Sequence, residues 1–159
     1  GTGRPGKILD RQREGLILRV KQMAWLQATP EKKKETRAQD YKRRYGEDCP
    51  ELDLPDVGGC EHLVAYLFEV GPTVRGEELT HQDLRYWQEN TGSELEEFEA
   101  TMLVQMSRAF IVQYRASSKT CPRPWRRELT PEEKAERGRQ QVAARKARQQ
   151  QQQQKQKEK

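Results

Sequence analysis

The sequence predicts an all-α protein with a small helical bundle in its middle. Apolar residues recur at helical spacing in several segments, and helix start and stop residues bracket those segments. No segment alternates apolar and polar residues over the length of a strand. The chain has 159 residues, of which 33% are hydrophobic and 35% are charged, so only part of it can bury a core.

Charge divides the chain into three regions. Residues 1–46 hold 13 Lys and Arg against 5 Asp and Glu, residues 47–118 hold 4 against 15, and residues 119–159 hold 13 against 5. Most hydrophobic residues lie in the middle region. We therefore expect a basic N-terminal helical region, an acidic helical core domain, and a basic, glutamine-rich C-terminal helix or tail. The basic flanks could contact the acidic middle or another acidic molecule.

The N-terminal region is expected to form a pair of helices. Apolar residues recur every seven positions from Leu9 to Met23, which predicts a helix over about residues 7–27. The sequence T-P-E at residues 29–31 combines a capping residue, a first-turn proline and an acid. It predicts a second, almost wholly charged helix that ends near Arg44.

The acidic middle is expected to be a compact bundle. The apolar stretch EHLVAYLFEV at residues 61–70 precedes Gly-Pro and predicts a helix of about three turns. Thr80 predicts the start of a helix that stops at Gly92. Ser93 and Glu96 have the capping-box spacing S-x-x-E, which predicts that a longer apolar helix begins there.

The C-terminal region is expected to be a polar helix. Thr-Pro-Glu-Glu at residues 130–133 is a helix start, and the helix runs into six consecutive glutamines, Gln149 to Gln154. Its last third is expected to be partly disordered, because it has almost no apolar residues to bury. The chain contains no apolar run long enough for a transmembrane helix.

Nothing in the sequence has the pattern of a catalytic or metal site. Asp83, Glu94, Glu96 and Glu97 lie in predicted first turns of helices, where the helix dipole stabilises their charge. Neither a nucleophile elbow nor a phosphate-binding loop occurs. Cys49, Cys60 and Cys121 lack the paired spacings of zinc ligands and are expected to be reduced thiols. We therefore expect no enzyme activity, no catalytic residue, no metal and no cofactor.

Two kinds of binding surface are predicted instead. Large aromatic side chains on short helices are good anchors for a protein partner, and the candidates are Tyr66, Phe68, Tyr86, Trp87 and Phe110. Basic clusters beside Trp25, Tyr41, Tyr45 and Trp125 could bind phosphate while the rings stack on bases. The possible nucleic-acid contacts are Lys32, Lys33, Lys34, Arg43, Arg44, Arg126 and Arg127.

The order of segments in the middle region resembles a known family. HLVAYLFEVGP is followed by a short loop, by LTHQDLRYWQENTGSELEEFEA and by MLVQMSRAFIVQY. This order is similar to the C-terminal part of small proteins of long-tailed bacteriophages, the tail assembly chaperones encoded just ahead of the tape-measure protein. The resemblance covers about residues 55–116. Its packing motifs match at His62, Leu63, Leu67, Phe68, Glu69, Gly71, Trp87, Thr91, Gly92, Glu99, Leu103, Met106, Ala109 and Phe110.

The resemblance implies a non-enzymatic chaperone in the host cytoplasm. It would bind the tape-measure protein and other tail proteins, associate with itself, and keep the tape-measure chain soluble during tail assembly. Such proteins are often made by ribosomal frameshift, which agrees with a chain that begins GTGRPG without an initiator Met. Two alternatives stay open: a nucleic-acid-associated protein that uses the basic N- and C-terminal helices, and a structural adaptor retained in the virion.

Overall fold

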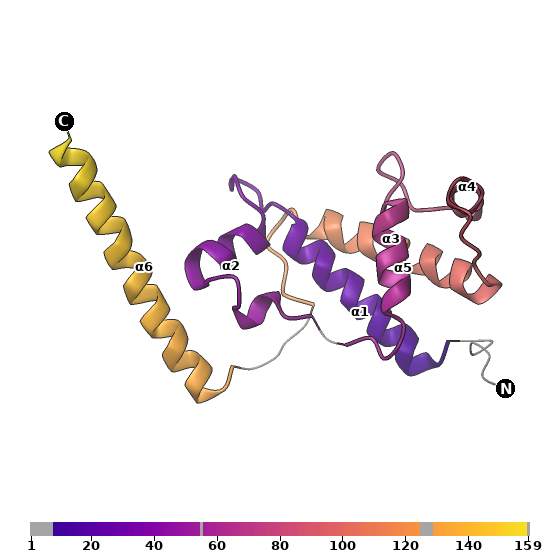
Figure 1. Ribbon diagram of the computed structural model, residues 1–159, viewed down its shortest axis with the longest axis horizontal. Coiled ribbons are helices and arrows are strands. Elements are labelled where there is room, and N and C mark those ends of the chain that lie inside the picture. The colour runs from indigo at the N-terminus through magenta and orange to yellow at the C-terminus, as the bar shows by residue number, and fades with distance from the viewer. Residues whose placement is uncertain (1–7, 55, 125–128, 159) are drawn as a thin grey trace.

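The computed structural model describes residues 8–54, 56–124 and 129–158 (Figure 1). Within these ranges every regular element is a helix, which confirms the predicted all-α class. None of these helices is long and apolar enough to cross a membrane. They are α1 (Asp10–Gln27), α2 (Arg37–Tyr45), the 3-10 helix η1 (Pro50–Leu52), α3 (Glu61–Val70), α4 (His81–Thr91), α5 (Glu97–Ala116) and α6 (Pro131–Lys157).

The hydrophobic core lies between α1 and α5, and α3 and α4 pack on α5. Leu16, Val20 and Ala24 follow one another at four-residue spacing along α1, and all three are fully buried. They share one core with Leu103 and Met106 of α5, which are buried to the same extent. A four-residue spacing keeps side chains on one face of a helix, so α1 buries a continuous stripe against α5.

This core crosses the boundary that composition placed at residue 46. Helix α1 belongs to the basic region 1–46, yet its apolar stripe lies in the core of residues 47–118. Charged residues such as Arg11, Arg13 and Glu14 are exposed on other faces of the same helix. The basic composition of residues 1–46 therefore does not indicate that this region contributes a helix to the core.

Helix α6 extends away from the rest of the molecule (Figure 1). It packs against α2, and none of its described residues is buried. Its last third was expected to be partly disordered; in the structure it is helical through the glutamine run as far as Lys157. A helix that buries no residue gains little stability from apolar packing.

Two helix starts follow their local sequence signals closely. The Thr80 hydroxyl accepts a hydrogen bond from the Asp83 amide at 3.2 Å, and the Asp83 carboxylate accepts one from the Thr80 amide at 2.9 Å. Thr130 and Glu133 form the same reciprocal pair at the start of α6. Gly92 ends α4 in the left-handed conformation, as predicted from its sequence position.

The predicted start of the second helix is wrong. Helix α2 begins after Thr36, and not at residues 29–31. The chain turns at Lys32, whose φ of 65° is incompatible with an α-helix, and the Glu31 amide donates a hydrogen bond to the Ser118 carbonyl at 2.8 Å. A tertiary backbone bond thus replaces the local start, and the reciprocal Thr36–Gln39 pair caps the helix instead.

The predicted start of the long helix is also wrong, by one turn. Helix α5 begins at Glu97, and Glu99 caps it by accepting a hydrogen bond from the Glu96 amide at 3.1 Å. The segment before it is held by α4, since the Gln88 side chain accepts a bond from the Leu95 amide at 2.8 Å. Ser93 therefore lies in the connection between the helices and does not cap α5.

Because α1 is part of the core, we expect Leu16→Ala to lower the free energy of unfolding by about 2–5 kcal/mol. Leu9, at the start of the same helix, is 59% exposed, so Leu9→Ala should change it by less than about 1 kcal/mol. Chemical denaturation followed by circular dichroism measures both. Equal effects of the two substitutions would contradict the placement of α1 in the core.

Candidate functional site

The five aromatic residues predicted to bind a partner differ in exposure. Tyr86 is 53% exposed on α4, whereas Trp87 and Phe110 are buried. Tyr66 and Phe68 are partly buried against the core. Trp87 and Phe110 therefore pack inside the bundle, and of the five rings only Tyr86 is largely exposed.

The buried rings nevertheless support two surface features. Tyr66 packs on Trp87 with ring centroids 5.1 Å apart, and on the other side it meets the edge of His62. Phe68 meets Phe110 edge to face at 5.9 Å, and Phe110 in turn stacks on Tyr114 at 5.9 Å. Each of these two sets of rings extends from the core to a hollow in the surface.

The first hollow holds about 430 Å³ beside the starts of α1, α3 and α5. Its polar groups are centred on Glu99, whose carboxylate is 1% exposed and lies 2.8 Å from Nε2 of His62. The same carboxylate caps α5. This buried acid is thus engaged in holding α3 and α5 together, which is a structural role. Residues that line the hollow include Ile8, Gln12, Cys60, His62, Tyr66 and Phe98.

The second hollow, also of about 430 Å³, lies along the last turns of α5. We name it the α5 groove; its lining residues are Gln27, Pro72, Thr73, Gly76, Phe110, Ile111, Tyr114 and Arg115. Its aromatic lining comes from Phe110, which is buried, and Tyr114, which is 46% exposed. Tyr114 was absent from the predicted anchors. Its position one turn after Phe110 is the signal that could have identified it.

One wall of the α5 groove is fixed by buried hydrogen bonds. The Ser107 hydroxyl, which is fully buried, donates to the Pro72 carbonyl and accepts from the Leu79 amide, both at 2.8 Å. Arg115 donates to the Gly76 carbonyl at 2.8 Å. The connection between α3 and α4 is therefore tied to α5 at both ends and in its middle, so the chain itself holds this wall of the groove in place.

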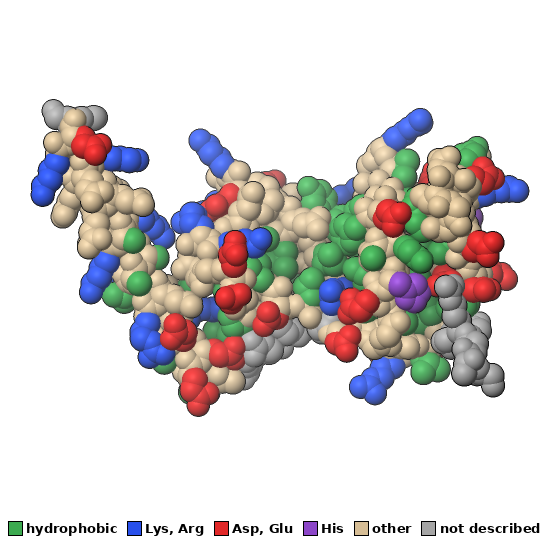
Figure 2. Space-filling model, in the orientation of Figure 1, with side chains coloured by type: hydrophobic (Ala, Val, Ile, Leu, Met, Phe, Trp, Pro, Cys, Tyr) green, Lys and Arg blue, Asp and Glu red, His purple; other side chains and the backbone are tan. Residues whose placement is uncertain are grey.

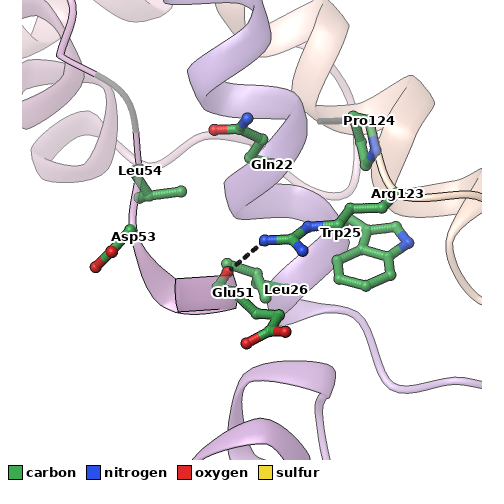
Figure 3. Close-up of a pocket in the computed structure, with 8 residues that line it drawn as sticks. All are labelled: Gln22, Trp25, Leu26, Glu51, Asp53, Leu54, Arg123 and Pro124. Carbon is green, nitrogen blue, oxygen red and sulfur yellow. Dashed lines mark hydrogen bonds between the residues drawn. The ribbon is translucent and has the colours of Figure 1, made fainter. Parts of the chain in front are cut away.

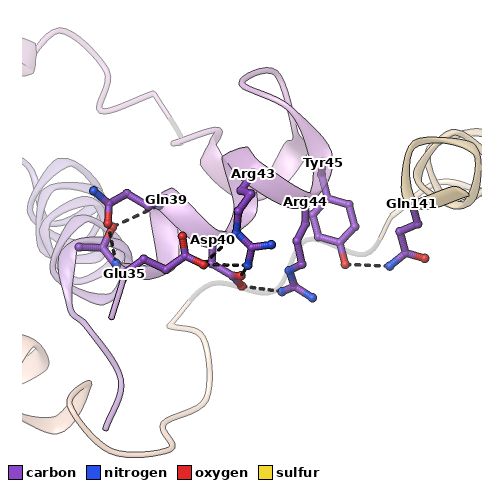
Figure 4. Close-up of polar contacts among 8 residues, drawn as sticks. Glu35, Gln39, Asp40, Arg43, Arg44, Tyr45 and Gln141 are labelled. Carbon is purple, nitrogen blue, oxygen red and sulfur yellow. Dashed lines mark hydrogen bonds and ion pairs between the residues drawn. The ribbon is translucent and has the colours of Figure 1, made fainter. Parts of the chain in front are cut away.

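The basic residues proposed to contact nucleic acid are partly occupied. Arg43 lies 2.7 Å from carboxylate oxygens of both Glu35 and Asp40, and Arg44 lies 2.8 Å from Asp40 (Figure 4). Arg43 is exposed but paired, whereas Lys32, Lys33 and Lys34 are exposed in the turn before α2. Arg126, Arg127 and Trp125 lie outside the described residues.

Three of the rings that were expected to stack on bases, Trp25, Tyr41 and Tyr45, pack against one another and against arginine side chains. Trp25, Tyr41 and Tyr45 form a row with centroid distances of 6.2 and 6.0 Å. Arg37 covers Trp25 at 4.7 Å, and Arg137 of α6 covers Tyr45 at 4.4 Å. These cation–π contacts join α1, α2 and α6 into a second, polar packing centre.

Glu51 occupies the middle of that centre. It is 4% exposed; its carboxylate pairs with Arg137, and its carbonyl accepts a hydrogen bond from Arg123 at 3.1 Å (Figure 3). Gln141 adds a bond of 3.1 Å to the Tyr45 hydroxyl (Figure 4). The first half of α6 is therefore fixed to α2 and η1. No sequence signal pointed to Glu51, because its partners come from distant parts of the chain.

Burial shifts several pKa values around this centre. It raises the pKa of the Tyr41 phenol and of the Cys49 thiol, and it lowers the pKa of the Arg37 guanidinium. All three groups keep their ordinary protonation state at neutral pH. Among the described residues the three cysteines are free thiols and no cluster of metal-ligating side chains occurs.

No protein-family model, curated protein or solved structure matches this chain.

Replacing Glu51 by Gln should loosen α6. Arg137 is only 20% exposed and would lose its charged partner, a change that costs several kcal/mol when a pair is fully buried. We expect amide hydrogen exchange in residues 134–141 to accelerate at least about tenfold, with exchange in α5 unchanged. Asp53→Asn, at an exposed carboxylate in the same segment, is the control, and an equal acceleration there would refute the role of Glu51.

The adjacent residues Tyr86 and Trp87 test the inner and outer faces of α4. Trp87→Ala should lower the free energy of unfolding by about 3–5 kcal/mol, since it empties a buried site. Tyr86→Ala should leave stability within about 1 kcal/mol, because that ring is half exposed. Thermal denaturation compares them, and equal losses of melting temperature would contradict this assignment.

Proposed function

We propose that this protein is a non-enzymatic tail assembly chaperone that binds helical segments of a phage tape-measure protein through the α5 groove. The observation that carries the proposal is the groove itself. Its lining combines apolar side chains, two of them aromatic, with the polar side chains of Gln27, Thr73 and Arg115, and its wall is fixed by Ser107. The aromatic part of the lining reaches solvent at Tyr114 and can contact the apolar face of an amphipathic helix.

The residues that carry the family resemblance also act together in the structure. Leu63, Leu67, Leu103 and Met106 share the core, and His62 lies 2.8 Å from Glu99. Phe110 and Phe68 back the α5 groove through their mutual ring contact. The residues that carry the resemblance thus form one connected piece of structure that ends at the proposed binding surface.

A nucleic-acid role of the arginines around α2 receives less support. Arg43 and Arg44 are held by Glu35 and Asp40, and Arg37, Arg44 and Arg137 cover aromatic rings of the same chain. Cations that are already paired release fewer counterions on binding phosphate. The proposed binding of a protein helix does not require these arginines. A structural adaptor in the virion would use the same groove, and it differs only in remaining bound after assembly.

Co-expression with the tape-measure protein tests the proposal. We expect the tape-measure protein to become soluble and to co-purify in a complex that survives high salt and nuclease, because burial of apolar surface does not weaken with salt. A complex that high salt or nuclease disperses, with no gain in tape-measure solubility, would contradict it.

Two exposed tyrosines locate the surface in the same assay. Tyr114→Ala should reduce the co-purified tape-measure protein at least about tenfold, as expected for the loss of an aromatic anchor. Tyr86→Ala, at a ring of similar exposure on α4, should retain the complex, and so should Val142→Ala on α6. Loss with Tyr86→Ala alone would move the contact to α4, and equal binding by all three would refute the α5 groove as the site.

A further inference from the structure

The second half of α6 is an exposed, unpaired basic surface. It contains Arg145, Lys146, Arg148, Lys155 and Lys157, and no Asp or Glu occurs between residues 137 and 157. All five side chains are exposed, and none of them forms an ion pair with another described residue. We name these five residues the α6 basic arm. Three of its charges lie within about 5 Å along the helix axis, at 1.5 Å per residue.

The opposite end of the molecule carries the complementary charge. Glu89, Glu94, Glu96 and Glu97 are exposed around the end of α4 and the start of α5, and no Lys or Arg occurs between residues 86 and 107. Glu94, Glu96 and Glu97 have no ion pair among the described residues, and Glu89 has only Arg85 at 3.8 Å. We name these four residues the acidic corner. Carboxylates gather over this end in Figure 2.

The arm cannot reach the acidic corner of its own chain. Arg137 and Gln141 hold the first half of α6 to Glu51 and Tyr45, and the helix continues without a break to Lys157. Helices α6 and α4 lie at opposite ends of the long axis of the molecule (Figure 1). Contact between the two surfaces therefore requires two molecules.

We propose that the α6 basic arm of one molecule docks on the acidic corner of a second copy of this chain. The two surfaces are different patches, so the contact is head to tail and leaves one arm and one corner free in every pair. Repetition gives a ring or an open row of copies. The proposal rests on charge and geometry alone and is independent of the proposed chaperone function.

The contact should be strong only at low ionic strength. Exposed ion pairs are individually weak, and salt screens them over about 10 Å at 0.1 M and about 3 Å at 1 M. We expect the weight-average mass of nuclease-treated protein at about 50 mM salt to rise with concentration to at least that of a dimer. At about 0.5 M salt it should return to the 18.6 kDa of one chain. Sedimentation equilibrium measures both.

Charge reversal tests which residues are in contact. The arm variant combines Arg145→Glu, Lys146→Glu and Arg148→Glu. The corner variant combines Glu89→Lys, Glu94→Lys and Glu97→Lys. Each alone should be monomeric at about 50 mM salt, because like charges then meet in every head-to-tail contact. An equimolar mixture of the two should regain dimers, since the reversed arm of one variant then faces the reversed corner of the other.

A matched control separates this contact from net charge. Replacing Lys32, Lys33 and Lys34 by Glu changes the net charge by the same amount as the arm variant, at exposed residues outside both surfaces. This control should associate as the unaltered chain does, and circular dichroism verifies that each variant is folded. A monomeric wild-type chain at low salt, dissociation of the control, a mixture that stays monomeric, or association lost on nuclease treatment would each overturn the proposal.

Discussion

Helices α1 and α5 bury their apolar stripes against each other, and this contact determines where the other elements can lie. It places the starts of α3 and α5 side by side, so that Glu99 can cap α5 and bind His62 at once. It also places the end of α1 near the end of α5, where the Glu31 amide binds the Ser118 carbonyl. A buried carboxylate is costly unless it is fully engaged, so this arrangement specifies one relative position of the helices.

The second centre, around Glu51, is held by different forces. It has a row of aromatic rings and the guanidinium groups that cover them, and only a few apolar side chains such as Leu26 and Cys49 are buried there. Its buried polar groups are incompletely satisfied: the Gln22 amide, 3% exposed, has no hydrogen-bond partner (Figure 3). Such a centre opens more readily than an apolar core, because water can replace its contacts. Loss of the Glu51 contacts should therefore release α6 and leave the bundle of α1, α3, α4 and α5 folded.

The sequence predicted the helix ends that are stabilised by hydrogen bonds between neighbouring residues. The Thr80–Asp83 and Thr130–Glu133 pairs and the Gly92 stop are satisfied by residues within one turn, and all were readable in the sequence. The signals at residues 29–31 and at Ser93 were also readable, but neither of them starts a helix, because Glu31 is bonded to Ser118 and Leu95 is bonded to Gln88. The functional surfaces divide in the same way. Aromatic positions were visible in the sequence, whereas the exposure of Tyr114 and the role of Glu51 depend on contacts between distant segments.

The two proposed surfaces differ in how firmly they are held, and this difference has a consequence for assembly. The α5 groove is formed by the bundle and by a connection held through Ser107. Binding of a helix there therefore costs little conformational entropy in the groove. The α6 basic arm projects from the weaker centre and makes contacts that salt screens. Copies bound along one long helical chain would lie close together, where even weak arm-to-corner contacts become effectively intramolecular. Strong binding of the long helical chain and weak binding between copies would thus favour rows of copies along that chain over self-association in solution.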